Sequence, residues 1–164
     1  MPSELDRKFD QVLAAVTGPG GRLVLDTDSQ GRSIVANFAP PLPSFFPTFC
    51  ALNAEAEAVV AGDERLTFAD LDRWSEQLAK ALVRRGIGKG DRVGIAMRNC
   101  PSWVIVYMAI AKAGGVATLL NGWWQPAEMQ HALQLTEPKL IIADAARAAR
   151  LEQCDANRFE LVSL

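Results

Sequence analysis

The chain has 164 residues and a mass of 17.8 kDa, and 49% of its residues are hydrophobic. This composition is typical of one globular domain and argues against an intrinsically disordered chain. Its 17 Lys and Arg residues and 19 Asp and Glu residues give a net charge of −2, which gives no electrostatic reason to expect a nucleic-acid partner. The 3 cysteines are odd in number and widely spaced. Neither a disulfide framework nor a zinc site is indicated, and we expect free thiols in a reducing cytoplasm.

The first 40 residues are predicted to form a helix and a β-hairpin. Ser3 followed by Asp6 is a helix N-cap pattern, and apolar residues recur behind it at helical spacing. These apolar residues are Leu5, Phe9, Val12, Leu13 and Val16. The glycine-rich run at residues 18–21 ends the helix. The two short strands expected after it, around a turn, are 22–26 and 32–38.

The next segment changes character. Residues 39–47 hold four of the 9 prolines, which predicts an extended linker or an arm lying on the main body. The short elements expected after it are a helix at 49–53 and a hairpin of strands at 58–60 and 65–66. Thr67, with Asp70 three residues later, then caps a long amphipathic helix that Gly86 ends.

From residue 92 onward, apolar strands alternate with helices. The predicted strands are 92–97, 116–120, 139–143 and 159–164. The predicted helices are 101–113, 126–135 and 145–151. This alternation is typical of βαβ units, so we predict an α/β fold with a parallel, doubly wound sheet covered by helices on both faces. The most apolar stretch runs from 103 to 120, and its helical part of about 14 residues, or about 21 Å, is too short to span a membrane, so a buried helix is predicted.

Residue types that carry catalysis or bind metals do not gather in this sequence. The glycine runs at 18–21 and 86–90 each lie between a helix and a strand, the reverse of a nucleotide-binding loop, so they are interpreted as a helix stop and a turn. His131, the single histidine, is interpreted as a structural or surface residue. Cys100 stands at a strand-to-helix junction where a thiolate could be activated, but without an identified partner it is interpreted as a plain thiol.

Trp123 and Trp124 are the most unusual feature of the sequence. They follow a predicted parallel strand at its carboxyl end, where α/β folds place ligand clefts. The two aromatic rings could line an apolar pocket, or they could plug the join between this unit and another. The plug is the favoured interpretation, and an exposed apolar surface is expected around this pair and the helix that begins near Trp103.

Six short motifs resemble the AMP-forming acyl-CoA synthetases of the adenylate-forming superfamily, in particular the long-chain fatty-acid–CoA ligases. They are LTFADL at 66–71, GDRVGI at 90–95, RNCPSW at 98–103, AGGV at 113–116, NGWWQPAEM at 121–129 and PKLII at 138–142. Each motif is weak alone, but six in the right order are specific. The resemblance covers residues 41–164, whereas residues 1–40 match no motif of the family and are treated as an extension.

The resemblance implies the reaction of the family. A fatty acid or another carboxylate attacks ATP to form an acyl-adenylate and pyrophosphate, and the thiol of CoA then displaces AMP, with Mg²⁺ assisting the phosphate chemistry. The segments that carry this chemistry in the family are a phosphate loop, an adenine-binding segment, a ribose-binding Asp and a late Lys. All of them follow the region matched here, so no catalytic, cofactor-binding or metal-binding residue is predicted in this chain.

The resemblance therefore implies an incomplete N-terminal subdomain of an acyl-CoA synthetase involved in fatty acid metabolism. The chain ends inside an apolar strand pattern, and we expect a truncated domain whose main partner is the remainder of its own polypeptide. Alone it is expected to be inactive and to self-associate through its exposed apolar surface. The alternative is a free-standing α/β interaction or binding module without ligase chemistry.

Overall fold

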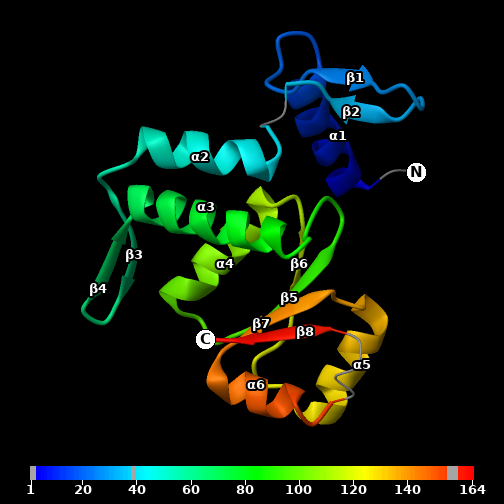
Figure 1. Cartoon of the computed structure of the whole chain (residues 1–164). Coiled ribbons are helices and arrows are strands. Elements are labelled where there is room, and N and C mark those ends of the chain that lie inside the picture. The colour runs from blue at the N-terminus through cyan, green and yellow to red at the C-terminus, as the bar shows by residue number, and fades with distance from the viewer. Residues whose placement is uncertain (1–2, 38–39, 155–158) are drawn as a thin grey trace. The chain divides into compact units, whose positions relative to one another are not determined.

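The computed structural model describes residues 3–37, 40–154 and 159–164. The chain divides into two compact units, residues 1–40 and residues 41–164 (Figure 1). Each unit is described by itself below. Residues 38 and 39, which belong to the predicted strand 32–38 and the predicted linker 39–47, lie outside the described residues.

The first unit contains a helix and a two-stranded sheet. Helix α1 (Glu4–Thr17) begins with the predicted capping box: the Ser3 hydroxyl accepts the Asp6 N–H at 3.1 Å, and the Asp6 carboxylate accepts the Ser3 N–H at 2.7 Å. Gly18 ends the helix as its C-cap. Strands β1 (Leu25–Thr27) and β2 (Ser33–Val35) pair antiparallel and are shorter than predicted. None of the described residues 3–37 is buried, so this unit has no core of its own.

The second unit is built on a parallel sheet of four strands, as predicted. The strands are β5 (Arg92–Ala96), β6 (Val116–Leu119), β7 (Leu140–Ala143) and β8 (Glu160–Ser163). Their order across the sheet is β6-β5-β7-β8, and every neighbouring pair is parallel. Each predicted strand agrees with an observed one to within one residue at either end.

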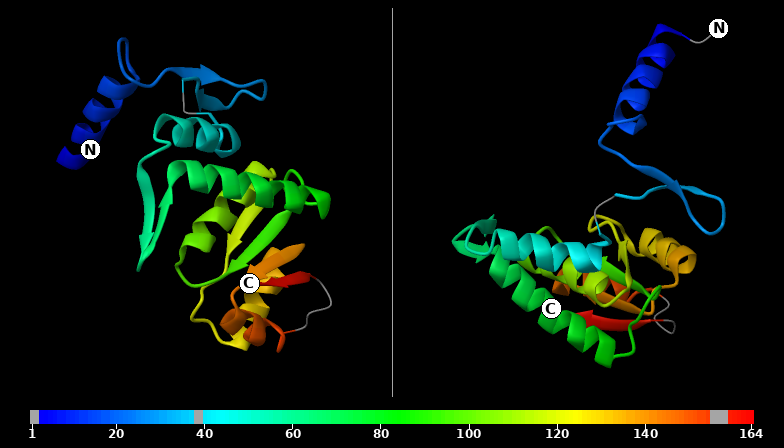
Figure 2. Two further views of the ribbon diagram at one scale, coloured as in Figure 1. Left: turned by 60° about the vertical axis from the view of Figure 1, so that its left-hand side comes forward. Right: turned by 90° about the horizontal axis from the view of Figure 1, so that it is seen from above.

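Helices cover both faces of this sheet, as the doubly wound prediction requires (Figures 1 and 2). The helices that follow the strands are α4 (Pro101–Lys112), α5 (Pro126–Thr136) and α6 (Ala145–Leu151). Helix α3 (Phe68–Arg84) and α4 pack on one face, where Val93, Ile95 and Ile110 are almost fully buried. Helices α5 and α6 pack on the other face around Met129 and Ile141. Among the described residues, no helix is both long and apolar enough to cross a membrane.

Two further elements form a third cluster beside α3 and α4. The hairpin of β3 (Glu57–Ala61) and β4 (Glu64–Thr67) leads into α3, whose start is fixed by the capping box of Thr67 and Asp70. Helix α2 (Leu42–Leu52) lies alongside α3 (Figure 1). The side chains that join this cluster are Cys50, Leu66, Leu71, Ile105 and Met108.

Helix α2 corrects two predictions. The extended linker predicted at 39–47 is wrong for residues 42–47, and the helix predicted at 49–53 is too short. Pro43 lies in the first helical turn, where a missing N–H costs nothing because that N–H has no partner within the helix. Pro47 lies inside the helix and does remove one hydrogen bond, but Phe46 and Cys50 on either side of it pack into the third cluster. Tertiary packing therefore overrides the proline pattern.

Helix α4 corrects a third prediction. An exposed apolar surface was expected along this helix, but α3 covers one side of it, and Ile105 and Met108 pack with the third cluster. Half of the residues of α4 are buried, which agrees with the buried helix that was also predicted from the apolar character of this segment. The part of the expectation that concerns Trp123 is treated below.

Candidate functional site

The carboxyl ends of β5 and β7 form the topological switch point of the sheet. The chain leaves β5 through α4 toward β6 on one side and leaves β7 through α6 toward β8 on the other. Doubly wound sheets place their ligand crevices at such points. Here Asp144, directly after β7, donates its N–H to the carbonyl of Ala96 at 3.2 Å, and its carboxylate accepts the N–H of Arg98 at 2.8 Å. The residue that follows β7 is therefore bonded to the end of β5.

Asp144 is also the N-cap of α6. Its carboxylate accepts the backbone N–H of Arg147 at 3.0 Å and forms an ion pair with the Arg147 guanidinium at 3.2 Å. Partial burial alone would raise the pKa of this carboxyl group. The hydrogen bonds from the N–H groups of Arg98 and Arg147, together with the Arg147 charge, outweigh burial and hold the pKa of Asp144 below its usual value of 3.8.

Two arginines of α6 then fix the segment after β6. Arg147 donates from Nε to the carbonyl of Gly122 at 3.0 Å, and Arg150 donates to the carbonyls of Gly122 and Trp124 at 3.0 and 3.2 Å. A Cβ atom at position 122 would lie 3.1 Å from the Arg147 side chain, so glycine permits this close approach. We call Asp144, Arg147 and Arg150 the edge network. It joins the carboxyl ends of β5, β6 and β7.

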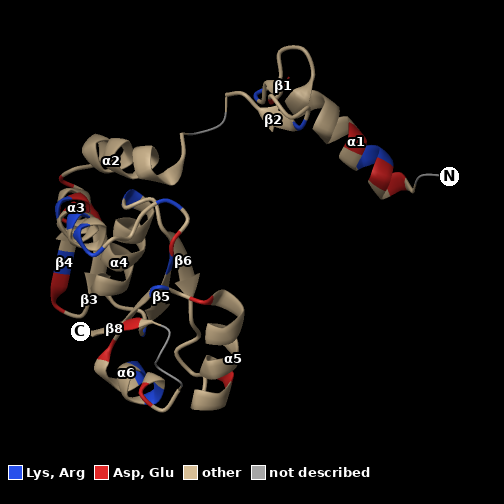
Figure 3. Cartoon of the chain, turned by 45° about the vertical axis from the view of Figure 1, so that its right-hand side comes forward, with Lys and Arg blue, Asp and Glu red and all other residues tan. Residues whose placement is uncertain are grey.

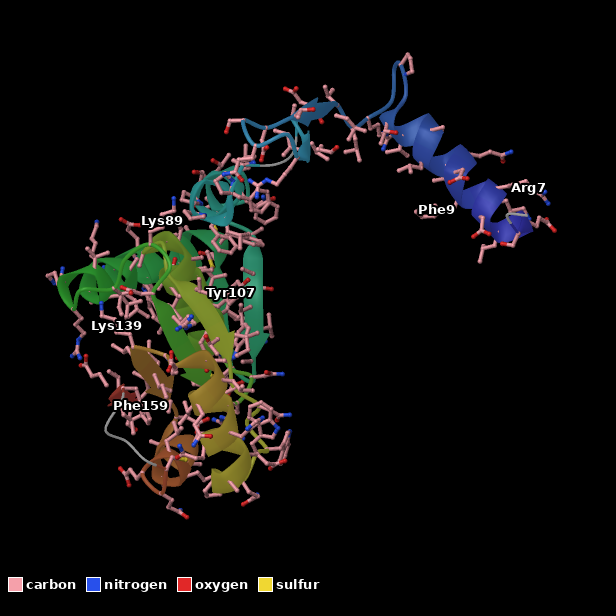
Figure 4. The ribbon with its side chains drawn as sticks, turned by 90° about the vertical axis from the view of Figure 1, so that its right-hand side faces the viewer. Arg7, Phe9, Lys89, Tyr107, Lys139 and Phe159 are labelled. Atoms are coloured by element: carbon pink, nitrogen blue, oxygen red, sulfur yellow. The ribbon has the colours of Figure 1, made fainter. Side chains whose placement is uncertain are left out.

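The two tryptophans have different roles. Trp124 is half-buried and packs against the α5–α6 cluster of its own unit. The plug between this unit and another, which the sequence favoured, stays a prediction. Trp123 is 83% exposed, which confirms the exposed apolar surface at this position. It lines a hollow of about 600 Å³ together with Trp103, Leu119 and Arg147. Trp103 in turn stacks on Tyr107 with ring centroids 5.6 Å apart (Figure 4 labels Tyr107).

The other residues singled out from the sequence do not line this hollow. His131 is exposed on α5. Cys100 is the N-cap of α4, half-buried, and lines a neighbouring hollow of about 420 Å³. The two glycine runs end α1 and connect α3 to β5, as interpreted, and Lys89 in the second run is exposed. Within the described part of the chain, no group of three His, Cys, Asp or Glu residues could hold a metal ion.

The edge network is the part of the site that the sequence interpretation missed. Its one local signal is an Asp directly after a strand with an Arg three residues later, which is the pattern of a helix N-cap followed by an ion pair. The contacts of Arg147 and Arg150 with Gly122 span 25 and 28 residues, and no local pattern indicates them. Chemically, the network positions a loop and a tryptophan beside a hollow. Asp144 and Arg147 form an ion pair with each other, and Arg150 donates to backbone carbonyls.

Comparison with known proteins shows the family to which the chain belongs. The model of the family described as AMP-binding enzyme matches residues 46–163, which is most of the chain. The chain belongs to the AMP-binding enzyme family. The matched residues lie within the second unit and include the doubly wound sheet and the residues of the edge network.

Individual relatives agree with this assignment. The medium/long-chain-fatty-acid–CoA ligase FadD6 of Mycobacterium tuberculosis is 36% identical over 97 residues, which are 59% of this chain and 16% of that protein. A crystal structure of a benzoate CoA ligase from Burkholderia xenovorans LB400 has a similar fold, with a TM-score of 0.72 and 17% identity over 77% of this chain and 26% of that one. The chain thus spans less than a fifth of the length of FadD6.

A third relative bears on the first unit. CymA of Salinispora arenicola, described as a probable non-canonical nonribosomal peptide synthetase, is 32% identical over 148 residues, which are 88% of this chain and 2% of that protein. A match of this length exceeds the second unit and must extend into residues 1–40. The extension is therefore not peculiar to this chain, although no family motif was found in it from the sequence.

Proposed function

We propose that the protein to which this chain belongs is an AMP-forming fatty-acid–CoA ligase, in which residues 41–164 form the scaffold of the N-terminal subdomain. The match of the AMP-binding family model across residues 46–163 carries this proposal. The identity to FadD6, a medium/long-chain-fatty-acid–CoA ligase, supports a fatty acid as the substrate class. The three free cysteines support a cytoplasmic location.

The proposed reaction has two steps. The carboxylate of the fatty acid attacks the α-phosphorus of ATP, which forms the acyl-adenylate and releases pyrophosphate. The thiol of CoA then attacks the acyl carbon, and AMP leaves. Both steps develop negative charge on phosphate oxygens, which positive groups must stabilise.

The residues of this chain do not fit ATP, Mg²⁺ or CoA. The sequence has no Ser- and Thr-rich phosphate loop, and the described residues offer no carboxylate cluster for a divalent cation. We therefore propose that segments outside these 164 residues hold both nucleotides and the metal. The contribution of this chain is structural, and its principal partner is the remainder of its own polypeptide.

Substrate-dependent exchange of labelled pyrophosphate into ATP tests the proposal. The assay compares the protein encoded by the complete gene with the 164-residue chain, each with medium-chain and long-chain fatty acids and with benzoate as a control carboxylate. We expect exchange with fatty acids for the complete protein and none for the chain alone. Exchange with benzoate but not with fatty acids would contradict the substrate class, and exchange by the chain alone would contradict its scaffold role.

A further inference from the structure

Helix α4 is enclosed by other elements of the second unit. It contacts α2, α3, β3, β5 and β6, and of its 12 residues only Ser102 is exposed. Figure 3 shows α4 in the colour of uncharged residues along nearly its whole length. An amphipathic helix has one apolar face that fixes its rotation about its own axis, whereas a helix that is apolar all round has no such preference. Burial of apolar side chains therefore specifies the packing of α4 only weakly.

One charged residue interrupts the apolar surface of α4. Lys112 is the last residue of the helix, and its side chain is only 4% exposed. Its Nζ donates to the carboxylate of Asp72 on α3 at 2.7 Å and to the backbone carbonyl of Asp72 at 3.0 Å. The hydroxyl of Ser75, a fully buried residue, donates to the same carbonyl at 3.1 Å. Three polar side chains thus meet within a contact between α3 and α4 that consists mainly of apolar side chains.

The energetics of this ion pair favour a role in specificity. Burial removes most of the hydration of the Lys112 ammonium group, and the attraction of Asp72 does little more than offset that cost. A shift of α4 by one helical turn would move Nζ by about 5.4 Å, away from the two oxygens of Asp72, and would leave a buried charge without its partner. The pair therefore penalises other packings of α4 more than it stabilises the observed one.

We propose that the ion pair between Asp72 and Lys112 is a register latch, which fixes the position of α4 against α3 and thereby the position of Trp103. Trp103 lies in the first turn of α4, stacks on Tyr107 and lines the hollow of about 600 Å³ at the carboxyl edge of the sheet. Lys112 lies at the other end of the helix, about 14 Å away along its axis. It is a positioning residue that acts on Trp103 through the helix.

Fluorine NMR of the 164-residue chain labelled with fluorotryptophan tests the latch, with each signal assigned from a Trp→Phe variant. A double variant that combines Asp72→Leu with Lys112→Met replaces the ion pair by an apolar pair. We expect its urea midpoint to equal or exceed that of the native chain. Its Trp103 signal should split or broaden, because α4 takes more than one position. The Trp124 signal, from a ring that packs on the other face of the sheet, should stay single and unshifted.

Two single variants complete the experiment. Lys112→Met leaves Asp72, whose side chain is 38% exposed and keeps part of its hydration, so the chain should fold and its Trp103 signal should change as in the double variant. Lys80→Met is the matched control. It makes the same substitution at an exposed lysine of α3, which pairs with Glu76 at 3.3 Å, and it should leave the Trp103 signal unchanged.

Two results would overturn the proposal. A single Trp103 signal at its native position in the double variant would show that the ion pair does not set the register of α4. A lower urea midpoint of the double variant would show that the pair is needed for stability instead. Both measurements use the chain itself and are independent of ligase activity.

Discussion

The two units of this chain use the same local device with different outcomes. Helix α1 in residues 1–40 and helix α3 in residues 41–164 both begin with a complete capping box, at Ser3 and at Thr67. Behind Thr67, the stripe that includes Leu71 and Leu82 is buried against the sheet and α4. Behind Ser3, no residue of α1 is buried. A cap specifies where a helix begins, but only a partner surface turns that helix into part of a stable fold.

The two units also differ in their match to the AMP-binding family. The region matched by the AMP-binding family lies in the unit that has buried clusters on both faces of its sheet. That unit supplies a rigid platform and the edge network at its carboxyl end. The first unit lies outside the matched region, and none of its described residues is buried.

Core truncation should give the largest difference between the units. Ile95 is almost fully buried in the centre of the sheet, and Ile95→Ala should lower the free energy of unfolding by about 3 kcal/mol, because a cavity is left in the core. Leu13→Ala on α1 removes a side chain that is half exposed and should change the free energy of unfolding by less than about 0.5 kcal/mol. Urea unfolding followed by near-UV circular dichroism measures both. Equal losses would mean that α1 is part of the same cooperative core.

Loss of the charge on Asp144 should have an intermediate effect that depends on pH. Asp144→Asn should cost about 1.5 kcal/mol at neutral pH, because the Arg98 and Arg147 N–H groups and the Arg147 guanidinium lose a charged acceptor. The pKa of this carboxyl group is lowered in the folded state, so its contribution is fully present above the unfolded value of 3.8 and is lost as pH falls below it.

Urea titrations of the native chain and the Asn variant from pH 7 down to pH 3 follow this contribution. The difference between them should shrink in the acid range. The control is Asp28→Asn in the turn between β1 and β2, whose carboxylate is hydrogen-bonded to Arg32 and also has a lowered pKa. This variant should leave unfolding of the sheet unchanged at every pH. A difference for Asp144 that stayed constant with pH would contradict the charged network.

The caps should give the smallest effect. Thr67→Ala should destabilise the second unit by about 1 kcal/mol, because the N–H of Asp70 loses its acceptor. Ser3→Ala should lower the helical signal in the far-UV spectrum but leave the unfolding midpoint of the sheet unchanged. A shift of that midpoint by Ser3→Ala would show that the two units unfold together.

The success of the sequence interpretation depended on how local each signal was. The strands of the sheet, α3 with its Thr67 cap and the turn at Gly86 all follow from neighbouring residues, and each was predicted. Of helix α2 only the carboxyl-terminal part, at 49–53, was predicted, because Pro43 and Pro47 suggest an extended segment and the contacts of Phe46 and Cys50 that stabilise the helix come from distant elements.

The candidate site was harder to predict than the fold. The position of the Trp123–Trp124 pair at a strand end correctly indicated the carboxyl edge of the sheet. The loop that carries the two rings is held by Arg150, which donates to the Trp124 carbonyl and is separated from it by 26 residues. Such a contact has no local pattern, and only the folded chain shows it.

Native-state hydrogen exchange at low protein concentration tests most directly whether the second unit alone is a self-sufficient scaffold. The account predicts that the amides of β5 and β7 exchange only through global unfolding, because those strands are central in the sheet. It predicts that the amides of α1 exchange orders of magnitude faster, because no residue of α1 is buried. Protection of α1 equal to that of β5 at low concentration would contradict it.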